Sequence, residues 1–142
     1  MKTIPLVVIT TFCLLSSQNG ISQNLKKNKA IVRQLFEEVL SNKKIELYKT
    51  IHTSDFRGHG LKKDYSLEDD YQASKQLIES YSDGTVTITH LIAEGNMVSA
   101  RWVVNAMMGG QKMFFDGFTI FRIEGFKIAE EWSLVNQLEM LK

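Results

Sequence analysis

Two ionisable residues in the chain have the types and surroundings that proton transfer requires. His59 lies between two glycines in GHG, and an imidazole with its ordinary pKa of about 6.5 can act as a general acid or base at neutral pH. Glu130 lies two residues before Trp132 and so shares its face of an expected strand. Apolar surroundings would raise the pKa of the Glu130 carboxyl toward the range of a general base. His59 and Glu130 are therefore the candidate catalytic residues.

The same two residues also have structural interpretations. A histidine flanked by glycines can tie a loop to backbone carbonyl groups through its ring nitrogens. A carboxylate at the rim of a sheet can pair with a nearby cation, and Arg101 and Arg122 are the available partners for Glu130. Both interpretations remain open at this point.

Neutral polar and aromatic side chains supply candidate ligand contacts. Asn136 carries an amide that can orient a ligand carbonyl group but cannot take up a proton at neutral pH. By the two-residue period of a strand, Thr119 points to the same side as Phe115 and Phe121. Large aromatic residues of this kind form cores and line pockets. The candidate ligand-binding residues are Phe36, Trp102, Phe115, Thr119, Phe121, Trp132 and Asn136.

The composition fits one globular domain and excludes several classes of partner. The chain has 142 residues, of which 44% are hydrophobic and 23% are charged. Its 17 basic and 16 acidic residues balance, and no basic run is longer than two residues, so a nucleic-acid interface is not expected. The three histidines show no paired spacing, so neither a metal site nor another cofactor is expected.

Residues 1–22 have the features of a signal peptide. Lys2 provides a positive start, an apolar stretch follows over residues 4–15, and Gly20 and Ser22 are small residues that place cleavage before Gln23. The apolar stretch is too short for a convincing membrane span, although an uncleaved anchor is the alternative. Cleavage would remove the single cysteine, Cys13, and leave an exported domain over residues 23–142, periplasmic or secreted, with no membrane span.

Hydrophobic periodicity predicts three helices in the first part of this domain. Apolar residues recur at intervals of three and four over residues 25–40, which is typical of an amphipathic helix with one buried stripe. Residues 43–51 repeat the pattern more weakly, and the glycines at 58 and 60 break it. Ser66, three residues before Asp69, resembles a capping box and predicts a third helix that ends before Gly84.

The second part of the domain reads as strands. Residues 85–93 are rich in β-branched side chains, residues 97–107 and 112–123 alternate between apolar and polar, and residues 127–137 complete the set. Glycines stand at each junction, as expected of hairpin turns. Three helices followed by an antiparallel meander indicate an α+β fold with the helices packed on one face of the sheet.

Four stretches, in this order, carry a resemblance to a known family: NKAIVRQLFEEVL, DFRGHG, IAEGNMVSARW and FTIFRIEGFKIAEEW. They resemble the SnoaL-like polyketide cyclases of the nuclear-transport-factor-2-like superfamily. The resemblance implies a curved antiparallel sheet wrapped around a long helix, leaving a cone-shaped apolar pocket. It also implies a homodimer formed through the sheet.

The resemblance further implies where catalytic groups should lie. In the cyclases, an acid in the terminal strands acts as general acid or base while polar neighbours hold the enolate. The family commonly has a histidine before the last tryptophan and an acid four positions after it, where this chain has Glu131 and Asn136. The family often has an acid at the position of Thr119 and a histidine at that of His59.

Because Asn136 cannot act as a base, the sequence favours an exported domain that binds a small, mostly apolar molecule in its pocket. One alternative is a cyclase- or isomerase-like enzyme, without a metal, that uses His59 or Glu130 for proton transfer. A second alternative is a non-catalytic, dimeric interaction protein whose pocket is filled by side chains. Sequence alone leaves these three functions open.

Overall fold

The structure is a computed structural model that describes the backbone of residues 7–136 and 139–140 and the side chains of residues 20–136. The helical segments are α1 (Val7–Gln34), the π-helical η1 (Leu35–Ser41), the 3-10 turn η2 (Ile45–Leu47), α2 (Tyr48–Ile51) and α3 (Leu67–Ser80). The strands are β1 (His52–His59), β2 (Asp64–Ser66), β3 (Tyr81–Glu94), β4 (Met97–Met108), β5 (Gln111–Glu124), β6 (Lys127–Val135) and β7 (Glu139–Met140).

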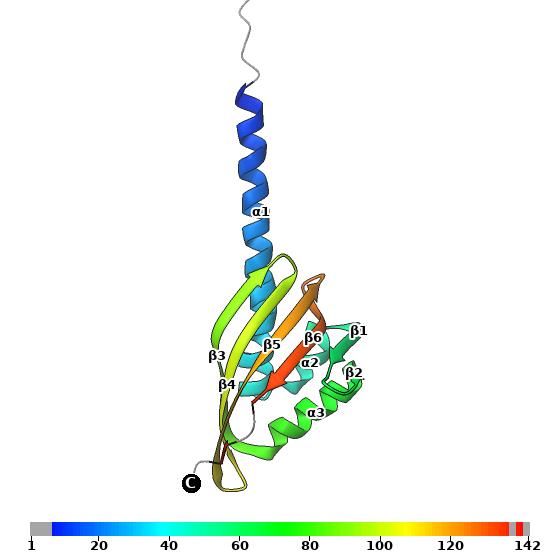
Figure 1. Cartoon of the computed structure of the whole chain (residues 1–142), viewed down its shortest axis with the longest axis vertical. Coiled ribbons are helices and arrows are strands. Elements are labelled where there is room, and N and C mark those ends of the chain that lie inside the picture. The colour runs from blue at the N-terminus through cyan, green and yellow to red at the C-terminus, as the bar shows by residue number, and fades with distance from the viewer. Residues whose placement is uncertain (1–6, 137–138, 141–142) are drawn as a thin grey trace, which may run out of the picture.

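The predicted first helix is confirmed as a continuous helical segment, formed by α1 and then the π-helical η1, that runs from Val7 to Ser41. It packs against the sheet through a buried stripe that includes Val32, Phe36 and Val39, and the Asn28 amide fastens it by donating to the carbonyl oxygen of Gly95 over 3.1 Å. The N-terminal part of α1 projects well beyond the sheet (Figure 1). Among the described helices, none is long and apolar enough to cross a membrane.

The strands form one mixed sheet in the order β2-β1-β6-β5-β4-β3, with β7 paired to β5. All pairings are antiparallel except that of β1 with β6, which is parallel. The predicted α+β arrangement is confirmed, with the four long strands close to their expected bounds. The expected loop at residues 58–60 was wrong in part, because Gly58 and His59 belong to β1 and only Gly60 begins the loop.

The two faces of the sheet differ in burial. Along β4 and β5 every second residue is buried, as the two-residue period requires. This inner face, together with the buried stripe of α1 and η1, forms the hydrophobic core. The helices thus cover the inner face (Figure 1), and the alternate residues of the central strands point to the outer face.

A β-bulge near the start of β6 reverses which residues of that strand face inward. Ile123 pairs with Ile128, but the preceding residue of β5, Arg122, pairs with Glu130, so Ala129 is an extra residue in β6. Ile128 and Ala129 are both buried, and the alternation then resumes with Glu131 inside. A one-residue shift moves every following side chain to the other face.

Candidate functional site

A cavity of about 140 Å³ lies between the helices and the inner face of the sheet. Most of its wall is apolar and consists of Leu35, Phe36, Leu40, Leu77, Val86, Trp102, Val104, Phe115 and Phe121. Its polar wall consists of Tyr48, Asp70, Ser74, Thr119, Glu131 and Ser133. The bulge in β6 is what directs the last two of these into the cavity.

Glu131 is a buried carboxyl group on this polar wall, and its side chain is only 8% exposed. Tyr65 donates a hydrogen bond of 2.7 Å to its Oε1 atom from across β1. Gly58 pairs with both Tyr65 and Glu131 in the sheet. A Cβ atom at Gly58 would lie 1.9 Å from the Tyr65 ring, so the glycine is what allows the ring to cross β1 and reach the acid.

Asp70 is a second acid on the cavity wall, supplied by the first turn of α3. The predicted capping box is present, because the Ser66 hydroxyl accepts from the Asp69 N–H while the Asp69 carboxylate accepts from the Ser66 N–H. This cap fixes the start of α3 and so places Asp70 beside Tyr48, whose hydroxyl donates to it. Tyr48 is itself buried.

The pKa values of both acids are raised above their ordinary values. Burial, and then the charge of Asp70, raise the pKa of Glu131 to about 8, against a lowering effect of the Tyr65 hydrogen bond. Burial also raises the pKa of Asp70, and burial and the nearby acids raise the pKa of both tyrosines, which therefore stay neutral donors. The cavity thus has an acid pair in which ionisation of one carboxyl opposes ionisation of the other.

A hydrogen-bonded chain of three side chains forms another part of the polar wall. The Trp102 indole donates to the Thr119 hydroxyl over 3.0 Å, and the Thr119 and Ser133 hydroxyls lie 2.9 Å apart. Thr119 and Ser133 are direct cross-strand partners on β5 and β6. Gly117 makes room for the indole, because a Cβ atom there would lie 2.3 Å from it.

The structure places both predicted catalytic residues outside this cavity. Glu130 and His59 meet on the other face of the sheet, where His59 Nε2 and the Glu130 carboxylate are 2.8 Å apart. The Arg122 side chain donates to Glu130 over 2.6 Å, which is the ion pair that the sequence left open. Hydrogen bonds from His59 and Arg122 lower the pKa of Glu130, the opposite of what a general base in a pocket requires. The expected interior position of Glu130 is therefore wrong, because of the bulge.

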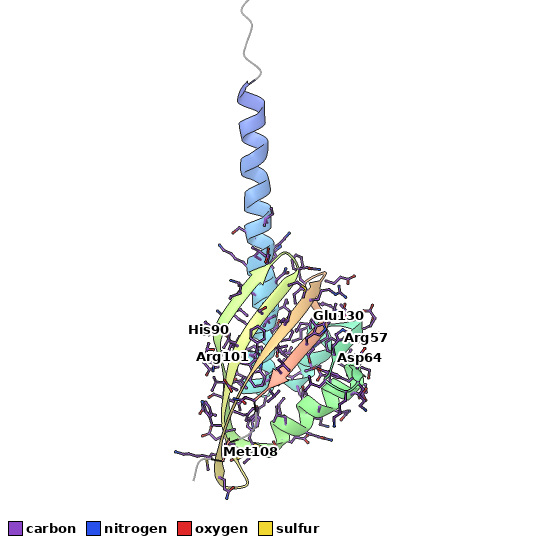
Figure 2. All side chains as sticks on the ribbon, viewed as in Figure 1. Arg57, Asp64, His90, Arg101, Met108 and Glu130 are labelled. Atoms are coloured by element: carbon purple, nitrogen blue, oxygen red, sulfur yellow. The ribbon has the colours of Figure 1, made fainter. Side chains whose placement is uncertain are left out.

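His59 is held on the outer face by several contacts. Its Nδ1 atom lies 3.2 Å from the Asp64 carboxylate, and its ring stacks on Trp132 with 4.6 Å between centroids. Arg57 lies 3.9 Å from the same aspartate. Figure 2 shows Arg57, Asp64 and Glu130 gathered where β1, β2 and β6 meet. These contacts explain the position of His59 as part of a surface ion network.

Asn136 also lies on the outer face, contrary to its expected place in the pocket. Its amide donates to Asp116 over 3.1 Å, and the Asp116 carboxylate accepts from Arg101 over 2.6 Å. Asn136 and Trp132 are both exposed, and neither is part of the cavity wall. The other predicted ligand contacts do line the cavity: Phe36, Trp102, Phe115, Thr119 and Phe121.

Sequence reasoning missed Asp70, Glu131, Tyr48 and Tyr65 as site residues. The resemblance did mark the Glu131 position, where the family has a histidine, and this is the signal that could have identified it. The predicted capping box does locate Asp70 in the first turn of α3, but the position of Asp70 near Glu131 depends on tertiary packing. Tyr65 carries no local signal, because it reaches Glu131 across β1, whose pairing with β6 joins distant parts of the chain.

A larger hollow, of about 320 Å³, lies near Gly84, Asn105 and Lys112. We place the candidate site in the smaller cavity because the buried acids line that cavity. Within residues whose side chains are described, no three potential ligands gather in a way that could hold a metal ion.

Comparison with known proteins identifies the family. The model of the SnoaL-like polyketide cyclase family matches residues 30–142, which include the cavity and both acids. The chain belongs to the SnoaL-like polyketide cyclase family. No curated protein matches it significantly in sequence.

Solved structures of diverse proteins share the SnoaL-like fold of this chain. AclR, a proposed hydroxylase from Streptomyces galilaeus, is 16% identical with a TM-score of 0.73, covering 79% of this chain and 80% of AclR. A proposed SnoaL-like polyketide cyclase from Jannaschia sp. CCS1 is 16% identical with a TM-score of 0.69, covering 78% and 86%. An LEH-like epoxide hydrolase from M. tuberculosis is 11% identical with a TM-score of 0.67, covering 80% and 85%. At these identities the likeness establishes the fold, and the reaction must be argued from the site.

Proposed function

We propose that this SnoaL-like domain binds a small, uncharged, mostly apolar molecule in its cavity. We further propose that it takes a proton from one atom of this molecule and returns one to another atom, as a cyclase or isomerase does. The observation that carries the proposal is Glu131, a buried carboxyl group on the cavity wall whose pKa is raised to about 8. A carboxyl group with a pKa near the working pH serves efficiently as general acid or base. Glu131 thus replaces Glu130 and His59 as the proposed catalytic residue.

The surroundings of Glu131 suit such a role. Near neutral pH, repulsion between the two carboxylates favours a state in which the Asp70–Glu131 pair retains one proton. The pair can then take a proton from one atom of a ligand and return one to another. Tyr65 holds the Glu131 side chain in place through its hydrogen bond, and Tyr48 does the same for Asp70.

The cavity also limits the size and charge of the ligand. Its volume of about 140 Å³ is close to that of a protein cavity known to take a single benzene ring, about 150 Å³. Two acids and an apolar wall disfavour anionic molecules, because burial of an unpaired charge is costly. We therefore expect ligands with one ring, or short chains, rather than fused multi-ring molecules.

Exchange of hydrogen for deuterium tests the reaction without knowledge of the natural substrate. Cyclohexanone has one ring and acidic C–H bonds, and NMR in D2O reports their exchange. We expect the protein to accelerate this exchange and the Glu131→Gln variant to lose about 10²-fold or more of that acceleration. Glu130→Gln is the matched control, one residue away on the outer face, and should stay within twofold of the natural protein.

The outcomes separate the candidate functions. If Glu130→Gln or His59→Ala loses as much of the exchange rate as Glu131→Gln, the catalytic residues lie on the outer face and the proposal is wrong. If one-ring ligands bind in the cavity but the protein gives no exchange with any enolisable ketone, catalysis is refuted and a binding protein remains. If no one-ring ligand binds, the pocket function is wrong and an interaction protein is the remaining alternative.

We also propose export and a homodimer formed through the outer face. Removal of residues 1–22 would leave intact the part of α1 that packs on the sheet, which includes Asn28 and Val32. Mass spectrometry of protein from the native envelope fraction should show a chain that begins at or near Gln23. Recovery of only the full-length chain in the cytosol would contradict export.

A further inference from the structure

We propose that Ser133 donates a hydrogen bond to a carbonyl oxygen of the ligand, and that Trp102 and Thr119 fix the direction of its hydroxyl group. Ser133 would thereby select ligands that carry a carbonyl group over hydrocarbons of the same shape. This inference rests on the proposed binding of a small molecule in the cavity but does not require proton transfer. It rests on the hydrogen bonds that link Trp102, Thr119 and Ser133.

Trp102 and Thr119 form the buried end of this chain of hydrogen bonds. An indole N–H can only donate, and the Trp102 N–H donates to the Thr119 hydroxyl oxygen over 3.0 Å. Thr119 is 3% exposed and Trp102 is 8% exposed, so water cannot easily satisfy either group. The Thr119 hydroxyl therefore accepts from the indole and still has one hydrogen of its own to donate.

The hydrogen bond between the Thr119 and Ser133 hydroxyls has a defined direction. The Ser133 oxygen, 2.9 Å away, is the acceptor that the structure offers to the Thr119 hydrogen. If Ser133 donated to Thr119 instead, the hydrogen of a buried hydroxyl would lack an acceptor, which costs about 1–3 kcal/mol. The bonds therefore run from Trp102 to Thr119 to Ser133. Each donation also polarises the next hydroxyl and makes Ser133 a better donor.

The Ser133 hydroxyl is the last member of this chain. Ser133 is half-buried and lines the cavity, and its hydrogen is the one in the chain not used by another member. It is thus available to an acceptor atom inside the cavity. A carbonyl oxygen suits it best, because such an oxygen accepts without having a hydrogen of its own to place.

The position of Ser133 relative to Glu131 defines the ligand further. The two residues lie on the same face of β6, separated by one residue, so their Cα atoms are about 6.6 Å apart. Their side chains can converge on neighbouring atoms of one small molecule. A ligand whose oxygen binds Ser133 would present the adjacent carbon toward Glu131, which describes a one-ring aldehyde or ketone.

Benzaldehyde and styrene form a probe pair for this inference. They have the same shape and one ring each, but only benzaldehyde has a carbonyl oxygen, and it has no acidic C–H bond next to the carbonyl group. We expect the protein to bind benzaldehyde about 3- to 10-fold more tightly than styrene. We also expect the infrared C=O stretch of bound benzaldehyde to lie at lower frequency than in an apolar solvent.

Variants then assign both effects to the chain of hydroxyls. Ser133→Ala should remove the preference for benzaldehyde and return the C=O stretch toward its value in an apolar solvent. Ser99→Ala is the matched control, since Ser99 is a strand serine on the outer face of β4 and does not line the cavity, and it should change neither readout. In Thr119→Val the C=O stretch should shift less than in the natural protein. In Thr119→Ser, which keeps the hydroxyl, the shift should equal that of the natural protein.

The results that overturn the proposal are distinct from those that overturn catalysis. Benzaldehyde that fails to bind, or a preference and C=O shift that persist in a folded Ser133→Ala variant, would refute it. A normal shift in Glu131→Gln supports it, because proton transfer is then absent while the oxygen is still held. A protein that gives the shift but no deuterium exchange would refute the proposed reaction alone.

Discussion

Glu130 and Glu131 are adjacent in sequence but lie in opposite environments. Glu131 is buried on the cavity wall beside Tyr65 and Asp70, and its pKa is raised. Glu130 lies on the outer face between His59 and Arg122, and its pKa is lowered. One carboxyl group is therefore suited to exchange a proton near neutral pH, whereas the other is a stable anion in an ion network.

The contrast shows that the face of the strand determines the chemistry of each acid. Both glutamates neighbour Trp132 in the chain, and this closeness first indicated that Glu130 should have a raised pKa. In the structure the tryptophan stacks on His59 at the surface, on the face of β6 opposite Glu131, so it does not bury that acid. Desolvation comes instead from the helices and strands around the cavity.

The bulge at Ala129 creates this contrast, because it turns two consecutive residues, Ile128 and Ala129, toward the inside. In a regular strand Ala129 would face outward, where a polar residue costs little. With the bulge, Ala129→Asp buries a carboxylate without the partners that Glu130 has, and we expect the free energy of unfolding to fall by at least about 4 kcal/mol. Urea denaturation measures this. Ala129→Gly keeps the register and should cost only about 1 kcal/mol. An Ala129→Asp variant as stable as the natural protein would show that the bulge is not what separates the faces.

The same bulge marks the limit of what the sequence could predict about the fold. Strand alternation correctly grouped Glu130 with Trp132 and Glu131 with Ser133, but alternation alone does not say which group is inside. The helices and the four long strands were predictable because their periodicity is local. Strand β1 was not, since its parallel pairing with β6 joins residues that are about 70 positions apart, such as Gly58 and Glu131.

The site residues could be predicted only on strands whose residues alternate between the two faces of the sheet. Phe115, Thr119 and Phe121 lie on one face of β5, as expected, and line the cavity. Asp70 reaches the cavity because the capping box begins α3 at the right residue, and its pairing with Glu131 depends on tertiary packing. The sequence marks Gly58 as a loop residue, but Gly58 lies in β1 and makes room for Tyr65.

Replacement of each glutamate by glutamine should have opposite effects on stability. The pKa of Glu131 is raised on folding from its ordinary value of about 4.5 to about 8, so the folded state keeps a proton that the unfolded state loses between these values. The free energy of unfolding therefore falls as pH rises through this window. Glu131→Gln does not titrate, and we expect it to be more stable than the natural protein at pH 8 by roughly 2–4 kcal/mol, with a smaller difference at pH 5.

Thermal or urea unfolding at the two pH values measures this difference. Glu130→Gln removes a partly exposed ion pair and should lower stability only slightly. If Glu131→Gln is less stable than the natural protein at pH 8, burial does not raise the pKa of this acid and the catalytic assignment loses its basis.

The outer face should act in assembly while the inner face binds the ligand. Phe118 and Leu134 are cross-strand partners and are 42% and 59% exposed, and Trp132 is exposed on the same face of β6. An apolar patch of this kind on a small domain is typical of an interface. Light scattering at micromolar concentration should give twice the monomer mass, and Leu134→Lys should weaken the dimer at least tenfold. Leu61→Lys, at an exposed loop position, should not. A monomeric natural protein would refute the dimer.

The smallest effect should come from a change that leaves the fold intact and tunes Glu131 alone. Tyr65 donates to the Glu131 carboxylate over 2.7 Å and so lowers its pKa against the effect of burial. Tyr65→Phe keeps the ring that crosses Gly58 but removes the hydroxyl, so the pKa of Glu131 should rise further. Less of the ionised, basic form of Glu131 is then present at pH 7, so the rate of exchange at pH 7 should fall severalfold. The rise of the exchange rate with pH should move to higher pH, while the plateau at high pH should be nearly unchanged.

Deuterium exchange of cyclohexanone from pH 6 to pH 10 measures this profile. Tyr71→Phe is the control, because Tyr71 packs against Tyr48 without contributing to the pKa of Glu131, and its profile should match that of the natural protein. A profile that moves to lower pH, or that moves equally in both variants, would mean that Glu131 is not the group whose ionisation limits the reaction.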